Sequence, residues 1–381
     1  MNANATAISG SVSAEVLCAH IGRLVTHESP SSDLAAVAAS ARTLAALGTE
    51  LLGRAPEVVE LEGRTHLRWR FGASTRVLLV GHHDTVWPLG SLATHPFAVV
   101  DGVLTGPGSF DMKAGVVMAL HAVAGLAERD GVTLLVTGDE ELGSPTSRTL
   151  IEHEATGADA ALVLEASGPG GALKTERKGV SLYTVRVHGR AAHAGLEPER
   201  GVNATVAAAH ATLAIAALAD PAAGTTVTPT VLHSGTTGNT VPAEAAITVD
   251  VRLRTAAEQD RVDLAIRALE PAVPGSTITV DGGPNRPPLE AQASAALFRR
   301  ADRLSVTLGL PAPTAVAVGG ASDGNFTAGI GVPTLDGLGA VGGGAHADDE
   351  HVIVGELAPR TRLLTALIDD LLQSPDRNED S

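Results

Sequence analysis

The sequence predicts an α/β fold, in which a mainly parallel sheet carries helices on both faces and a smaller α+β unit is inserted into the chain. Three observations lead to this prediction. The chain has 381 residues, which exceeds one ordinary hydrophobic core and favours two domains. Its first half alternates continuously apolar runs with helical patterns. From about Lys178 the strand-like runs instead alternate between apolar and polar residues, as half-exposed strands do.

Buried strands and helices alternate over the first half of the chain. The run Val77–Val80 is apolar at every position, which is typical of a strand covered on both faces of a sheet. Ser32 or Asp33 is a candidate N-cap for the second helix. Strands are expected at Thr65–Arg70, Arg76–Gly81, Val132–Thr137 and Ala160–Leu164, and helices at Ser13–Thr26, Ser32–Leu52, Met112–Glu128 and Thr146–Glu154.

The inserted unit has the order β-α-β-β-α-β, which is that of a ferredoxin-like two-layer fold. The glycine- and proline-rich segment Gly282–Pro288 is interpreted as a hinge that closes the insertion. We therefore predict a large domain of residues 1–178 and 287–381 and an inserted domain of residues 179–286. The inserted elements are expected at Val180–His188, Val202–Leu218, Val227–His233, Glu244–Leu253, Ala256–Leu269 and Thr277–Val280, and the large domain resumes with Leu289–Leu308, Thr314–Val318 and Leu357–Leu372.

Composition excludes several classes of protein. The net charge of −16 argues against a surface that binds nucleic acid. Cys18 is the single cysteine, so no internal disulfide framework is possible. The polar start Met1–Ser13 does not resemble a signal peptide, and the apolar runs Val116–Ala127 and Val206–Ala219 are too short to cross a bilayer. We expect a cytoplasmic protein with no membrane partner and a frayed polar tail at Asp376–Ser381.

Asp111 lies in a tight loop, Thr105–Gly115, between an extended run and a helical pattern. Gly106–Gly108 interrupts the extended run, and the apolar pattern of a buried helix begins at Met112. An N-cap role for Asp111 is the simple interpretation. The groups that surround it in the sequence favour a functional role instead.

These groups are histidines and carboxylates that follow the buried strands. His82 comes at the carboxyl end of one strand, where open α/β sheets place their sites, and Asp84 can face the same side and orient its ring. Asp139–Glu141 follows the next strand; a solvated loop is the alternative, but adjacent carboxylates repel one another unless cations neutralise them. Glu165 and His346 complete an O/N ligand set suited to zinc or a similar divalent ion. The number of carboxylates indicates two ions that share one of them, about 3.5–4 Å apart.

Six motifs occur along the chain in the order Gly-His-His-Asp-Thr-Val, Gly-Pro-Gly-Ser-Phe-Asp-Met-Lys, Asp-Glu-Glu, Ala-Ala-His-Ala-Gly, Gly-Asn-Thr-Val-Pro-Ala and His-Ala-Asp-Asp-Glu. Together they resemble the motifs of a known family. The chain resembles the aminoacylase and glutamate carboxypeptidase family of dinuclear zinc hydrolases, and most of all the bacterial glutamate carboxypeptidases, from about Leu78 to Val352. The resemblance implies a zinc-exopeptidase-like sheet domain with an inserted lid.

The resemblance also implies a role for each residue near the metals. Asp111 would bridge two zinc ions, and the peptide from Asp111 to Met112 would be cis. Glu140 would be the general base, which takes a proton from water and later gives it to the leaving amine. The other metal ligands would be His82 and Glu165 at one ion, and Glu141 and His346 at the other.

The inserted domain would supply the substrate contacts. His193 would stabilise the oxyanion, in the family often from the partner subunit of a dimer. Asn239 would bind polar groups of the substrate, and Arg286 would grip its free α-carboxylate. Arg252 is either a further substrate-binding residue or part of a surface ion pair. A homodimer through the inserted lid is expected.

The expected activity is hydrolysis of the amide bond of a C-terminal or N-acylated amino acid, as in a glutamate carboxypeptidase. An N-acyl amino acid or acetylornithine-type deacylase is the alternative with the same chemistry. A non-catalytic metal-binding relative is a further alternative, which the presence of Glu140 argues against.

Overall fold

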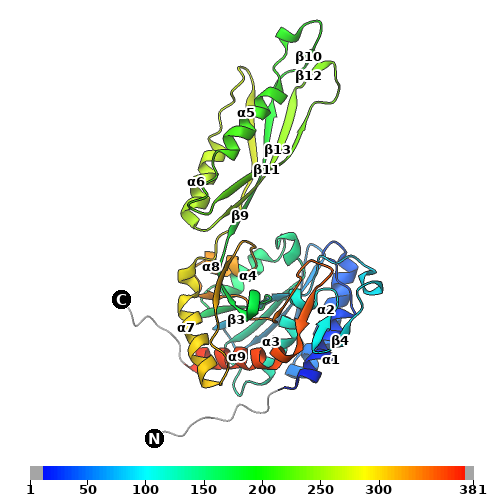
Figure 1. Cartoon of the computed structure of the whole chain (residues 1–381), viewed down its shortest axis with the longest axis vertical. Coiled ribbons are helices and arrows are strands. Elements are labelled where there is room, and N and C mark those ends of the chain that lie inside the picture. The colour runs from blue at the N-terminus through cyan, green and yellow to red at the C-terminus, as the bar shows by residue number, and fades with distance from the viewer. Residues whose placement is uncertain (1–11, 374–381) are drawn as a thin grey trace. The chain divides into compact units, whose positions relative to one another are not determined.

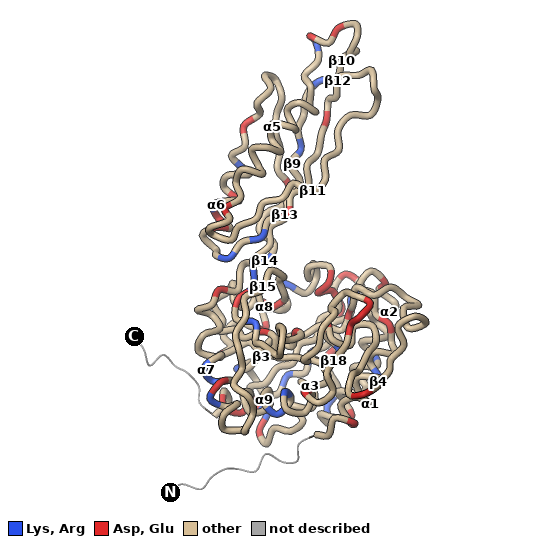
Figure 2. Tube along the Cα trace, viewed as in Figure 1, with Lys and Arg blue, Asp and Glu red and all other residues tan. Residues whose placement is uncertain are grey.

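The chain forms two compact units, seen in a computed structural model that describes residues 12–373 (Figure 1). The first unit comprises the described parts of residues 1–175, 291–317 and 322–381, and the second comprises residues 176–290 and 318–321. The tail expected at Asp376–Ser381 and most of Met1–Ser13 lie outside the described residues. Within residues 12–373, no helix is both long and apolar enough to cross a membrane. Basic and acidic residues are interspersed along the trace (Figure 2).

The first unit is built on a six-stranded sheet of order β1-β2-β6-β3-β7-β16. The pairs β6/β3, β3/β7 and β7/β16 are parallel, whereas β1/β2 and β2/β6 are antiparallel. The mainly parallel sheet is therefore confirmed, with an antiparallel edge hairpin that the sequence analysis included only in part. The strands are β1 (Glu57–Leu61), β2 (Arg64–Phe71), β3 (Val77–His82), β6 (Val132–Thr137), β7 (Ala160–Val163) and β16 (Thr334–Leu335).

Helices cover both faces of this sheet, as predicted. Leu79 of β3 faces a large core that includes residues of α1, α2, α3, α7 and α9. Its neighbour Leu78 faces a smaller core with Ile151 of α4 and Phe326 of α8. The alternation arises because successive side chains of a strand point to opposite faces. The helices are α1 (Ala14–Val25), α2 (Leu34–Leu52), α3 (Ala114–Ala124), α4 (Arg148–Ala155), α7 (Ala291–Thr307), α8 (Gly324–Gly329) and α9 (Val354–Gln373).

Local signals account for several helix ends. Asp33 caps α2, since its side chain accepts a hydrogen bond from the backbone N–H of Ala36 at 3.0 Å. The predicted helix start at Met112 was wrong, because Asp111 and Met112 have non-helical backbone angles and α3 begins at Ala114. The peptide from Asp111 to Met112 is cis, as the family resemblance implied.

Short strands complete the first unit. A four-stranded sheet of order β17-β18-β5-β4 lies in the segments before Asp111 and around His346. Its strands are β4 (Ala98–Val100), β5 (Val103–Thr105), β17 (Gly342–Gly343) and β18 (His351–Ile353). Two further strands, β8 (Leu173–Arg177) and β15 (Ala315–Val318), pair with each other and continue from the first unit into residues of the second.

The second unit is a four-stranded antiparallel sheet of order β11-β13-β9-β14 with two helices. Its core joins apolar residues of the sheet to those of both helices. The element order confirms the ferredoxin-like α+β fold. The elements are β9 (Gly179–His188), α5 (Ala204–Ala216), β11 (Thr226–Ser234), β13 (Glu244–Leu253), α6 (Ala256–Arg267) and β14 (Thr277–Arg286), with the short pair β10 (Ala192–His193) and β12 (Thr240–Val241).

The segment interpreted as a hinge is instead mostly strand. β14 continues through Gly282 to Arg286, and its pairing with β9 reaches Arg286 opposite Val180. Gly282 and Gly283 adopt positive φ, and a register shift between Pro284 and Arg286 accommodates the proline, which has no N–H to donate.

Candidate metal centre

Three neighbouring strands bring the candidate ligands to one edge of the first unit's sheet. β3 ends at His82, β6 is followed by Glu140 and Glu141, and β7 is followed by Glu165. β3 lies between β6 and β7 and runs parallel to both. Their carboxyl ends therefore meet at the same edge, where α/β sheets place their sites.

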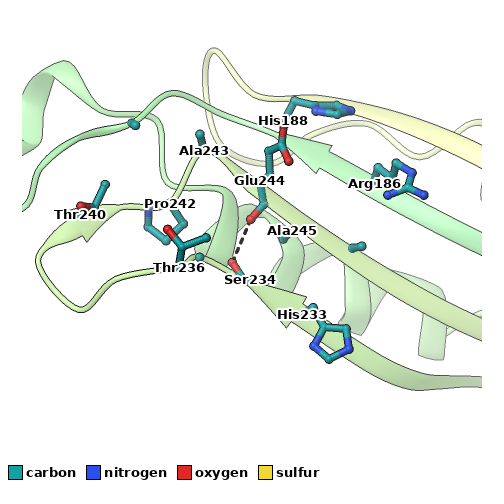
Figure 3. Close-up of a pocket in the computed structure, with 13 residues that line it drawn as sticks. Arg186, His188, His233, Ser234, Thr236, Thr240, Pro242, Ala243, Glu244 and Ala245 are labelled. Carbon is teal, nitrogen blue, oxygen red and sulfur yellow. Dashed lines mark hydrogen bonds between the residues drawn. The ribbon is translucent and has the colours of Figure 1, made fainter.

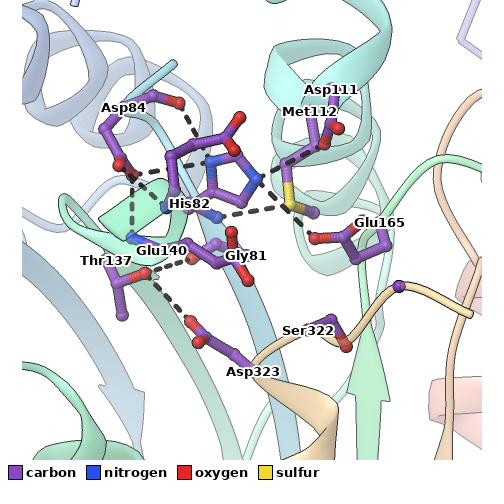
Figure 4. A network of polar contacts seen from close by, with 12 residues as sticks. Gly81, His82, Asp84, Asp111, Met112, Thr137, Glu140, Glu165, Ser322 and Asp323 are labelled. Atoms are coloured by element: carbon purple, nitrogen blue, oxygen red, sulfur yellow. Dashed lines mark hydrogen bonds and ion pairs between the residues drawn. The ribbon is translucent and has the colours of Figure 1, made fainter. Parts of the chain in front are cut away.

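Asp111 lies between the two candidate histidine ligands. Its Oδ1 is 3.4 Å from Nε2 of His82, and its Oδ2 is 3.4 Å from Nε2 of His346. Beyond His82, Oε1 of Glu165 is 3.7 Å from the same Nε2 (Figure 4). Beyond His346, Oε2 of Glu141 is 3.1 Å from its Nε2. The structure thus brings all five predicted ligands together, with one oxygen of Asp111 directed to each side.

The donor atoms fit a bound cation. Nε2 of His82 and Oδ1 of Asp111 are buried and have no hydrogen-bond partner among the described residues. Such orphaned polar atoms are costly unless something else satisfies them. Two groups of three residues can each offer one ligand atom per residue, and within each group these atoms lie within 4.8 Å of one another. The first group is His82, Asp111 and Glu141, and the second is His82, Glu140 and Glu165. A divalent ion is the partner that this mixture of imidazole and carboxylate groups suits.

The electrostatics of the cluster also favour a bound cation. Hydrogen bonding to Asp111 raises the pKa of His346 to about 10, and hydrogen bonding to Glu141 is the second largest cause of this increase. The pKa of Asp111 is held far below its usual range by its contacts with the two histidines, against the opposing effect of burial. The carboxylates therefore attract positive charge to the space between them.

Comparison with known proteins supports the same conclusion. The model of "Peptidase family M20/M25/M40" matches residues 78–370. Carboxypeptidase G2 of Pseudomonas sp. (strain RS-16) is 32% identical over 315 residues, which are 77% of this chain and 74% of that protein. Succinyl-diaminopimelate desuccinylase of Methylorubrum extorquens (strain PA1) is 31% identical over 329 residues, 79% of this chain and 84% of that protein.

The chain belongs to peptidase family M20/M25/M40. It is therefore a metal-dependent hydrolase of the carboxypeptidase or amidohydrolase type, as the motifs predicted.

Solved structures share the fold at lower identity. Aminopeptidase PepT from Bacillus cereus ATCC 10987 has a TM-score of 0.72 at 22% identity, over 95% of this chain and 100% of that one. An M20 family metallo-carboxypeptidase from Sulfolobus solfataricus has a TM-score of 0.67 at 17% identity, over 93% and 98%. These likenesses confirm the α/β fold.

Asp84 contacts the His82 ring through its backbone carbonyl and, at a longer distance, through its carboxylate. The close partner of His82 Nδ1 is the backbone carbonyl of Asp84 at 2.9 Å, and the carboxylate is 3.5 Å away. That carboxylate accepts hydrogen bonds from Ser31 Oγ at 2.6 Å and from the backbone N–H groups of Glu140 and Glu141 at 3.3 Å each. Asp84 thus connects the His82 strand end to the Glu140 turn, and its main chain orients the imidazole.

Within the acidic triplet, only two side chains reach the cluster. Asp139 is fully buried and accepts hydrogen bonds from the backbone and hydroxyl groups of Thr146 and Ser147. It fixes the segment that leads into α4. Glu140 is 8% exposed and Glu141 contacts His346.

Sequence reasoning missed two charged groups beside the site. The ammonium of Lys174 lies 3.9 Å from Oε2 of Glu165. Glu350 is a buried carboxylate that contacts the Asp111 loop. Glu350 belongs to the His-Ala-Asp-Asp-Glu motif, which was a signal that something there matters. For Lys174, on the short strand β8, no local signal existed.

The remaining predicted site residues belong to the second unit. His193 is exposed on β10, and its Nδ1 accepts hydrogen bonds from the N–H groups of Gly195 and Leu196. The carbonyl of Asn239 accepts a hydrogen bond from Ala194 N at 2.9 Å, which places Asn239 beside His193.

Arg286 is buried at the end of β14, and Arg252 lies on β13. Both ends of the Arg252 guanidinium contact Asp250 of the same strand at 2.9 Å. Of its two interpretations, the ion pair is the one seen in this unit.

A hollow of about 580 Å³ opens over the sheet of the second unit (Figure 3). Its walls include Arg186 and His188 of β9, His233 of β11 and Glu244 of β13. Thr240, which also lines it, is the strand partner of His193.

Proposed function

We propose that this M20 enzyme releases an amino acid with a free α-carboxylate from an acyl or peptidyl group, with two zinc ions in its site. His82 and Glu165 would hold one ion, Glu141 and His346 the other, and Asp111 both. The observation that carries this proposal is the position of Asp111, with one oxygen 3.4 Å from each histidine. Bound zinc supplies a Lewis acid that polarises the scissile carbonyl and acidifies a water molecule.

Glu140 would act as the general base. Its carboxylate takes a proton from the attacking water and returns it to the leaving amine, so that one water is consumed for each amide bond cleaved. Its backbone is fixed by the hydrogen bond to Asp84 at 3.3 Å, and its side chain is almost fully buried in the cluster. Its donor atom also lies near those of His82 and Glu165, so a ligand role is the competing assignment.

The second unit would act as lid and dimerisation domain. His193 would stabilise the oxyanion, Asn239 and Arg252 would bind polar groups of the substrate, and Arg286 would bind its α-carboxylate. The neighbouring positions of His193 and Asn239 support a shared contact surface. For Arg252, this role requires the substrate to compete with Asp250. We propose a homodimer through this unit.

Two substrate classes follow from the relatives. A carboxypeptidase substrate, from which a C-terminal amino acid is released, is favoured by the likeness to carboxypeptidase G2. An N-acyl amino acid is favoured by the likeness to the desuccinylase, which covers a larger share of the chain. Both carry the free α-carboxylate that a buried arginine such as Arg286 suits.

The test is a panel of N-acyl glutamates, other N-acyl amino acids and dipeptides, scored for amine release with zinc added. Turnover that a chelator abolishes and zinc restores is expected, and the same panel separates the two substrate classes. Loss of turnover when the α-carboxylate is amidated is also expected. Zinc binding without turnover of any panel member would favour the non-catalytic alternative.

A further inference from the structure

Glu350 is a buried carboxylate to which the proposed reaction assigns no part. It is only 4% exposed. One of its oxygens accepts hydrogen bonds from the indole Nε1 of Trp87 at 2.6 Å and from the backbone N–H of Gly108 at 3.0 Å. The other accepts from the N–H groups of Phe110 at 2.8 Å and Asp111 at 3.0 Å. An ionised carboxylate offers about four acceptor sites, so this side chain is fully used.

These four donors come from segments that carry proposed ligands. Trp87 lies in the loop that follows His82, and Asp111 is itself a ligand. Glu350 ends the turn that directly follows His346, since its own N–H donates to the carbonyl of Ala347 at 3.0 Å. One carboxylate therefore ties together three segments that are far apart in the sequence.

We propose that Glu350 is a positioning residue that holds Asp111 and His346 at the spacing the metal ions require. This inference rests on the ligand roles proposed above. A glutamine at this position has the same shape, but its amide nitrogen faces two N–H donors whichever way the group is turned. At least two hydrogen bonds are lost, and donors then oppose a donor. The loop of Asp111 loses either the bonds of Phe110 and Asp111 or the bond of Gly108, so it is held less firmly to the segment of His346, although neither ligand is altered.

The zinc dissociation constant measures this effect without reference to turnover. Zinc is titrated into the full chain against a chelating dye, for the wild type, Glu350→Gln and Glu350→Asp, and the melting temperature of each metal-free chain is recorded. Glu350→Gln is expected to weaken zinc binding about 10–100-fold, the usual loss when a partner that orients a ligand is removed. Glu350→Asp keeps the charge but is one methylene shorter, so a smaller loss in the same direction is expected.

Glu28→Gln is the matched control. Glu28 also accepts two backbone hydrogen bonds, from Gly90 and Leu92 at 2.8 Å each, and it fixes the same loop that carries Trp87. No proposed ligand is among its partners in these bonds. This variant is expected to lower the melting temperature of the metal-free chain but to leave zinc affinity unchanged.

The outcomes separate the inference from the proposed function. Wild-type zinc affinity in Glu350→Gln overturns the positioning role. If Glu350→Gln does not fold, wild-type affinity in Glu350→Asp overturns it equally. An equal loss of affinity in Glu28→Gln also overturns it, because the effect is then one of general loop stability. A wild-type chain that binds no zinc overturns the metal centre itself.

Discussion

Replacing Glu140 by glutamine separates the general-base role from a ligand role. The change is isosteric, and the backbone of Glu140 stays bonded to Asp84, so the chain is expected to fold. An amide cannot accept the proton of water at working pH. General-base catalysis contributes about 10²–10⁴-fold, so kcat should fall by that factor, which corresponds to ~3–5 kcal/mol in the activation free energy. The five proposed ligands remain, and zinc content should stay at the wild-type value.

The assay is amine release under saturating substrate, together with metal analysis of the purified protein. Glu141→Gln is the matched control, because it makes the same change one residue along, at a side chain 3.1 Å from His346 Nε2. It should lose zinc as well as activity. Wild-type kcat in metal-loaded Glu140→Gln would refute the base assignment. Zinc loss in Glu140→Gln equal to that in Glu141→Gln would instead make Glu140 a ligand.

Three further predictions address other parts of the chain. His193→Ala should lower kcat about 10²–10³-fold. Arg286→Ala should mainly raise KM, because a residue that binds the substrate carboxylate stabilises the ground state and the transition state alike. If kcat and KM are unchanged in both variants, the second unit takes no part in catalysis. Burial lowers the pKa of His121, which is stacked on His20, to about 4. Between these two pKa values the unfolded chain, with an imidazole pKa of about 6.5, binds more protons than the folded chain. The contribution of neutral His121 to the free energy of unfolding is therefore fully present above about pH 6.5 and is lost as pH falls towards about 4. Urea midpoints should drop over that range in the wild type and drop less in His121→Phe; an equal drop in both would contradict the assignment. Lys174→Met should tighten zinc binding about fivefold, equivalent to ~1 kcal/mol, because the ammonium of Lys174 no longer competes with zinc for the carboxylate of Glu165. Unchanged zinc affinity in the same dye titration would contradict this.

Much of the site could be predicted because its ligands follow strands that are buried on both faces. β3, β6 and β7 are buried at every position, so their sequences are continuously apolar and their ends are easily found. Parallel pairing then places His82, Glu140 and Glu165 at one edge without further information. Asp111 was located by the glycines and the proline that interrupt the strand before it.

Two other local patterns predicted the wrong secondary structure. The glycines and prolines of 282–288 are ordinary turn signals, but pairing with β9 on one side extends β14 through them. The helix pattern that begins at Met112 is apolar because Met112 is buried in the core, although its backbone is not helical. In both cases a tertiary contact overrode a local preference.

The sequence by itself determined the fold class, the family and the set of candidate ligands, because burial and motif order are written in short stretches of the chain. Only the tertiary structure decided which atoms meet. It directs the Asp84 carboxylate to two backbone N–H groups, while the Asp84 carbonyl holds the His82 ring. It also brings Glu350 to the Asp111 loop, 239 residues away. Such contacts join side chains to backbone groups whose positions depend on the whole fold, and no local periodicity records them.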